Sequence, residues 1–132
     1  MITSAYQKKA MRNIAVFLVE YIMKDKGYSR DEAVEFLMKT LDGLKGTDIV
    51  HFDVRGKSSI TDNMIICTGT SSRQVSAMAD NLITECKKAG FETFGEEGKN
   101  TADWIVVDLG QAIVHIMQRD AREMYQLEKL WA

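Results

Sequence analysis

The stretch that decides the fold is residues 53–72, which read DVRGKSSITDNMIICTGTSS. One apolar run ends at Val54 and a polar segment follows it. The apolar residues Met64 to Cys67 come next and lead to a turn at Gly69. This order predicts a strand, a loop, a second strand and the start of a helix. The unpaired amides of a helix N-terminus carry partial positive charge, so the turn at Gly69 is the first place to look for a ligand.

A long helix is predicted directly after this stretch. Apolar side chains recur at helical spacing over residues 75–86, Ser71 or Ser72 is placed to cap the helix, and Gly90 to end it. Residues 91–94 follow as a short predicted strand. Strand, helix and strand are therefore expected to form a parallel βαβ unit.

Further strands complete a predicted sheet. Residues 48–54 alternate weakly between apolar and polar, and residues 104–109 and 112–117 flank Gly110-Gln111, a two-residue turn typical of a hairpin. A last helix is predicted from about residue 120 to residue 130. We expect an α/β or α+β fold: a mixed sheet of about five strands with helices mainly on one face.

The N-terminal part is predicted to be helical as well. Apolar residues recur at helical spacing over residues 6–26, and Ser29 with Glu32 forms a capping box that opens a second helix. We therefore divide the chain into a helical N-terminal extension, residues 1–40, and a core domain, residues 41–132.

Composition and charge narrow the classes of function. A chain of 132 residues with a net charge of -2 and a pI near 5.7 lacks the basic face that broad nucleic-acid binding needs. Cys67 and Cys86 have no CxxC spacing and indicate buried free thiols in a reducing compartment. With no apolar run of membrane-spanning length, the protein is predicted to be cytoplasmic, with a protein partner or a small ligand.

No motif predicts an enzyme. The turn Gly69 to Ser72 could cradle a phosphate, but it lacks the lysine of a P-loop, and a capping turn is the simpler interpretation. Nucleotidyl transfer needs two carboxylates spaced i, i+2 on one strand, whereas Asp103 and Asp108 fall on opposite faces. We expect no catalytic residue, no cofactor and no metal, and we interpret Arg119 and Arg122 as a solvated helix start.

One face of the last two predicted strands differs in composition from the other. Alternation places Trp104, Asp108, His115 and Met117 on the face turned away from the helices. This mixture of aromatic, apolar and titratable groups is typical of a binding surface. The alternative, that Trp104 and Met117 pack under a loop or the terminal helix, stays open.

Several long segments, taken in order, resemble one known family. They are DIVHFDVRGKSSITDNMIICTGTSSRQV (residues 48–75), GFETFGEEG (90–98), DWIVVDLGQAIVHIMQ (103–118) and REMYQLEKLW (122–131). From about residue 41 to residue 131 the chain resembles the ribosomal silencing factor family, also called the iojap family. The extension before residue 41 has no counterpart in that resemblance.

The resemblance implies a fold, a partner and a mechanism. The family fold is similar to a nucleotidyltransferase core without being known for that activity. Family members are cytoplasmic proteins that bind the large ribosomal subunit through ribosomal protein uL14 and so keep the small subunit from joining, which represses translation. Matched by position, the partner-binding residues are Trp104, Asp108, His115, Met117 and Tyr125, with Asp62 and Asn63 as secondary candidates.

Two other hypotheses remain at this stage. The first is a nucleotide-binding or nucleotidyl-transferring enzyme that uses the turn Gly69 to Ser72. The second is a homodimeric scaffold built through the N-terminal helices. The resemblance favours the ribosomal hypothesis over both.

Overall fold

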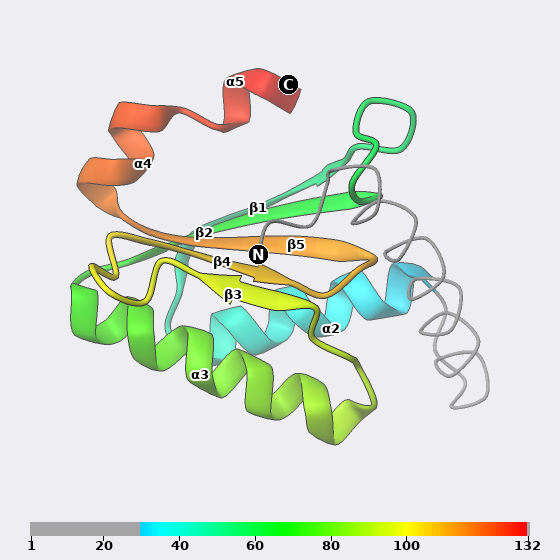
Figure 1. Cartoon of the computed structure of the whole chain (residues 1–132), viewed down its shortest axis with the longest axis horizontal. Helices are drawn as coiled ribbons and strands as arrows, with labels where there is room; N and C mark the ends of the chain where they lie inside the picture. Colours follow the sequence, from blue (N-terminus) through cyan, green and yellow to red (C-terminus); the bar gives the residue numbers. More distant parts are fainter. Residues whose placement is uncertain (1–29, 132) are drawn as a thin grey trace, which may run out of the picture.

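A computed structural model describes residues 30–131 of the chain (Figure 1). The predicted helix over residues 6–26 and the predicted Ser29 cap lie outside the described residues. The elements are α2 (Arg30–Gly43), β1 (Thr47–Asp53), β2 (Asn63–Gly69), α3 (Ser72–Ala89), β3 (Gly95–Glu97), β4 (Trp104–Asp108), β5 (Ala112–Gln118), α4 (Arg119–Tyr125) and α5 (Glu128–Trp131).

The strands form one mixed sheet in the order β1-β2-β5-β4-β3. β2 and β5 are parallel, and the three other neighbouring pairs are antiparallel. Helices α2 and α3 lie on one face, and the short helices α4 and α5 lie on the other (Figure 1). The predicted mixed sheet of about five strands is confirmed, and so is the hairpin formed by β4 and β5.

The predicted strand at residues 91–94 was wrong, and with it the βαβ unit. Phe91 is buried, and its ring stacks on Phe36 at a centroid distance of 5.5 Å, so the run begins by packing into the core. Its last residue, Phe94, donates its backbone N–H to the backbone oxygen of Asp108 on β4 over 2.7 Å and leads into the strand that follows. The strand begins at Gly95 and runs antiparallel to β4. The parallel partner of β2 is β5, which the chain reaches only after α3 and the two strands β3 and β4.

The core between the sheet and helices α2 and α3 is almost entirely apolar. Its buried members include Leu37 on α2, Leu82 on α3 and Ile65 on β2, each with 0 or 1% of its surface exposed. Both cysteines are free and buried, and burial raises the pKa of Cys67 to about 11 and that of Cys86 to about 12. The prediction of buried free thiols is confirmed.

The opposite face carries a smaller core beneath the C-terminal helices. Leu127 and Trp131 pack against a cluster that includes the fully buried Val54 and Met117. The single helix predicted for residues 120–130 was wrong, because Gln126 adopts the left-handed conformation with φ 49° and separates α4 from α5. Over the stretch that the structure describes, no helix is long and apolar enough to cross a membrane.

Candidate functional site

Two aromatic rings meet where the end of the sheet adjoins α4. Trp104 opens β4 and lies opposite Met117 of β5. The Trp104 ring lies 4.9 Å from the Tyr125 ring, centroid to centroid, at an interplanar angle of 44°. The residues come from β4 and from the last turn of α4, so the sheet and the helix together position the pair.

The rings form part of an exposed surface. Tyr125 is 54% exposed and its neighbour Met124 is 75% exposed, whereas Trp104 is half-buried. A pocket of about 480 Å³ opens beside them and is also lined by Asp103 and Asp120. We call Trp104, Met124 and Tyr125 the aromatic surface. Sequence reasoning missed Met124 as a surface residue because the end of the helix at Tyr125 has no glycine or proline to mark it.

Four of the predicted partner-binding residues are buried: Asn63, at 5% exposure, and three residues of the β4–β5 hairpin. Met117 is completely buried, and His115 and Asp108 are each 8% exposed. These three do face away from α2 and α3 as the alternation predicted, and on that face Ala121 of α4 and Trp131 of α5 pack against the cluster that contains Met117. For Met117 the alternative of packing under the terminal helix is therefore confirmed.

The buried His115 lies directly behind the aromatic surface. The Nε1–H of Trp104 donates a hydrogen bond to Nδ1 of His115 over 2.9 Å. Because Nδ1 accepts, the imidazole is neutral and its proton sits on Nε2. Burial lowers the pKa of His115 to about 4, which keeps it neutral at physiological pH.

The remaining predicted residues lie at the other end of the sheet. Asn63 is the first residue of β2 and pairs with Ala112 at the start of β5, while Trp104 pairs near the end of β5. Asn63 is buried, with its Oδ1 bound to Nε2 of His51 at 2.8 Å and its Nδ2 donating to the carbonyl oxygen of Gln111. The half-buried Asp62 is its neighbour.

Asp108 has a structural contact at that same end of the sheet. Its Oδ1 accepts a hydrogen bond from the backbone N–H of Gly110, which has φ 79°, and so fixes the turn between β4 and β5. The structure thus brings together Trp104, His115, Met117 and Tyr125, and it places Asp62, Asn63 and Asp108 apart from them.

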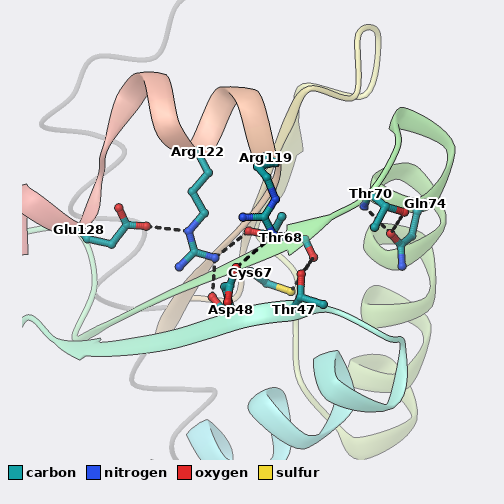
Figure 2. Close-up of polar contacts among 9 residues, drawn as sticks. All are labelled: Thr47, Asp48, Cys67, Thr68, Thr70, Gln74, Arg119, Arg122 and Glu128. Atoms are coloured by element: carbon teal, nitrogen blue, oxygen red, sulfur yellow. Dashed lines mark hydrogen bonds and ion pairs between the residues drawn. The ribbon is translucent and has the colours of Figure 1, made fainter.

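A half-buried arginine fastens α4 to the sheet, as Figure 2 shows. Arg122, whose side chain is 14% exposed, donates from Nε to Glu128 on α5 over 2.8 Å. Its Nη1 donates to the Thr68 hydroxyl on β2 over 2.8 Å and to the backbone oxygen of Asp48 on β1. Interpreting Arg122 as part of a solvated helix start was wrong; Arg119, 60% exposed, fits that interpretation.

The loop before Trp104 depends on one glycine. Gly98 has φ 99°, and a Cβ built on it would lie 2.0 Å from the carbonyl oxygen of Trp104. Its own carbonyl accepts a hydrogen bond from Ala102, which closes the loop. The close approach of the two backbones requires glycine here and fixes the chain that leads into the aromatic surface.

The turn at Gly69 is a helix cap. The hydroxyl of Ser71 accepts from the backbone N–H of Gln74 over 3.0 Å, and Oε1 of Gln74 accepts from the backbone N–H and the hydroxyl of Thr70 (Figure 2). A Cβ on Gly69 would lie 2.7 Å from Val75. Two of the amides that a phosphate could use, those of Thr70 and Gln74, are thus already bound within the turn. Within residues 30–131 no cluster of acidic, histidine or cysteine side chains is arranged to hold a metal ion.

Comparisons with known proteins agree on one family. The family model described as "Ribosomal silencing factor during starvation" matches residues 27–132. Over 99 residues the chain is 99% identical to ribosomal silencing factor RsfS of Haemophilus influenzae, an alignment covering 75% of this chain and 97% of that relative. It is 36% identical over 100 residues to RsfS of Chromobacterium violaceum, covering 76% of this chain and 82% of the relative.

A solved structure gives the same result. A crystal structure of a Chromobacterium violaceum protein superimposes with a TM-score of 0.76 at 35% identity and covers 79% of this chain and 87% of that one. The family match begins at residue 27 and so includes α2, most of which the sequence analysis assigned to the extension.

Proposed function

The chain belongs to the ribosomal silencing factor family, and we propose that it represses translation by binding ribosomal protein uL14 on the large subunit and blocking the small subunit. The observation that carries this proposal is the aromatic surface of Trp104, Met124 and Tyr125, exposed at the edge of an otherwise well-packed domain. Tyrosine, tryptophan and methionine are enriched in protein interfaces, and tryptophan and tyrosine are frequent energetic anchors.

The charge of the chain supports a protein partner. With a net charge of -2, the domain is poorly suited to neutralise RNA phosphates. Asp103 and Asp120 line the pocket next to the aromatic surface and would steer it towards a basic protein. Ribosomal protein uL14 is proposed as that partner because it is the one that the family resemblance implies.

The proposed mechanism is steric. A standard-size interface buries about 800 Å² on each partner and is held by a few anchors. A small protein bound in this way excludes a much larger partner if it occupies any part of that partner's contact surface. No chemical step is needed for this mechanism.

Trp104→Ala tests the proposal most directly. Purified protein is sedimented with free large subunits through a sucrose cushion, and small subunits are then added to measure how many joined ribosomes form. We expect Trp104→Ala to weaken binding more than about tenfold, because it removes an aromatic anchor. Ile60→Ala is the matched control, since Ile60 is 50% exposed but lies outside the aromatic surface.

The outcomes separate the parts of the proposal. Unmodified protein that neither pellets with large subunits nor lowers the yield of joined ribosomes would contradict the function. Normal binding by folded Trp104→Ala would leave the function standing and remove the aromatic surface from it. Cross-linking to a large-subunit protein other than uL14 would contradict only the choice of partner.

A further inference from the structure

We propose that His115 is a positioning residue: it holds the indole of Trp104 in the orientation that the large subunit recognises. This inference rests on the proposed function and changes the role of His115 from a direct contact to a support. With 8% of its surface exposed, His115 offers almost nothing for a partner to touch.

The geometry shows how the support works. His115 is on β5 and pairs with Val106, so it lies diagonally across from Trp104 on the same face of the hairpin. The two rings lie 5.7 Å apart, centroid to centroid, and Nδ1 of His115 accepts the indole N–H over 2.9 Å. The hydrogen bond ties the polar edge of the indole to the sheet, and the ring remains in contact with Tyr125.

Moving the indole away would leave a buried acceptor unpaired. The neutral imidazole has one acceptor nitrogen, and in this site that nitrogen is Nδ1. A buried acceptor without a donor is unfavourable, so alternative rotamers of Trp104 are disfavoured before any partner arrives. A partner then need not order that side chain, an advantage of roughly 2- to 10-fold in Kd for one side chain.

The hydrogen-bond acceptor is the feature to test. In His115→Leu the acceptor is removed while an apolar side chain fills much of the space. In His115→Asn the amide Oδ1 stands near the position of Nδ1 and still accepts from the indole. His51→Leu is the matched control, because His51 is the other histidine of the chain and its ring contacts Asn63 at the far end of the sheet.

Two measurements are made on the full chain. The Nε1–H resonance of Trp104 is followed in ¹H–¹⁵N spectra, with the Trp131 resonance as internal reference and Trp104→Phe for assignment. The Kd for free large subunits is measured by sedimentation. We expect His115→Leu to shift the Trp104 indole resonance, to speed its hydrogen exchange at least about tenfold, and to weaken binding roughly 2- to 10-fold. His115→Asn and His51→Leu should stay within about twofold of the unmodified protein in Kd.

A second variant keeps the test independent of the folding of His115→Leu. Trp104→Phe retains an aromatic ring but has no N–H to donate, so it should weaken binding by a similar factor. The double variant Trp104→Phe/His115→Leu should bind no more weakly than the worse of the two single variants, since both remove the same hydrogen bond. Additive losses in this cycle would overturn the inference.

Other results also overturn it. If His115→Leu frees the indole N–H but binds as tightly as the unmodified protein, the hydrogen bond does not position the surface for binding. If His115→Asn binds as weakly as His115→Leu, the acceptor is not the feature that matters. Failure of the unmodified protein to bind large subunits would instead contradict the proposed function, and the indole resonance distinguishes the two failures.

Discussion

The two faces of the sheet are built on different principles. Towards α2 and α3 the contacts are apolar and complete: Leu82, Cys86 and Val114 have no exposed surface. Towards α4 and α5 no residue of either helix is fully buried, and polar contacts of Arg122 and His115 do much of the positioning. The first face supplies stability, and the second face leaves Met124 and Tyr125 exposed, where we propose that a partner binds.

The largest expected effect is on the α3 face. Leu82→Ala should lower the free energy of unfolding by about 2–5 kcal/mol, because it removes a fully buried side chain and leaves a cavity. Urea unfolding followed by circular dichroism measures it, with the half-buried Ile83→Ala as control. At a temperature where the variant stays folded, we expect unchanged binding to large subunits. Loss of binding there would show that the two faces are not independent.

Stability should also depend on pH through the α4 face. The pKa of His115 is about 4 in the folded protein and 6.5 ordinarily, so between these values only the unfolded chain binds the proton. This contribution, on the order of 3 kcal/mol, is fully present above pH 6.5 and is lost as pH falls to about 4. Chemical unfolding across that range measures it.

The control for the pH dependence is a variant without the titrating group. His115→Leu should show a flatter profile between pH 6.5 and 4 than the unmodified protein. The exposed Asp53 acts in a different window: its hydrogen bonds with Arg55 lower its pKa from 3.8 to about 2, so its contribution is lost only below pH 3.8. Equal slopes above pH 4 in both proteins would contradict the assignment to His115.

The contrast between the faces also explains what could be predicted from sequence. The α3 stripe, its Ser71 cap and its Gly90 terminus were predictable because helix periodicity and capping are local properties. Which side chains of β4 and β5 share a face was predictable from alternation alone. The predicted pairing of residues 91–94 failed because the partner of a strand is decided by distant contacts.

Exposure on the second face was not predictable for the same reason. Alternation placed His115 and Met117 on the correct face but could not show that α4 and α5 cover it. The break at Gln126 has no glycine or proline to mark it, and it separates the exposed Met124 and Tyr125 from the covering residue Leu127. Arg122 bonds to Thr68, which is 54 positions earlier in the sequence, and to Asp48, which is 74 positions earlier. A local sequence pattern cannot predict contacts over such separations.

A smaller effect is expected from Arg122→Met. The substitution keeps an apolar stem but loses the hydrogen bonds to Glu128 and Thr68, which should lower the free energy of unfolding by about 1–3 kcal/mol. Arg119→Met is the control, because its exposed pair with Asp48 contributes at most about 1 kcal/mol. Since Arg122 holds the helix that carries Tyr125, its loss should also weaken large-subunit binding. A loss of stability with unchanged binding would mean that α4 stays in position on the sheet without the hydrogen bonds of Arg122.

The smallest expected change in stability comes from Met124→Ala. This variant distinguishes the two faces most clearly, because it should affect binding but not stability. Met124 is 75% exposed, so its truncation should alter the free energy of unfolding by less than about 0.5 kcal/mol. Large-subunit binding should nevertheless weaken several-fold, because burying the side chain against a partner contributes about 1–2 kcal/mol that the free protein does not use. Ile60→Ala, equally neutral for folding, should leave binding unchanged. If both variants bind normally, exposure on the α4 face does not by itself mark the contact surface, and the partner must be recognised through Trp104 and Tyr125 alone.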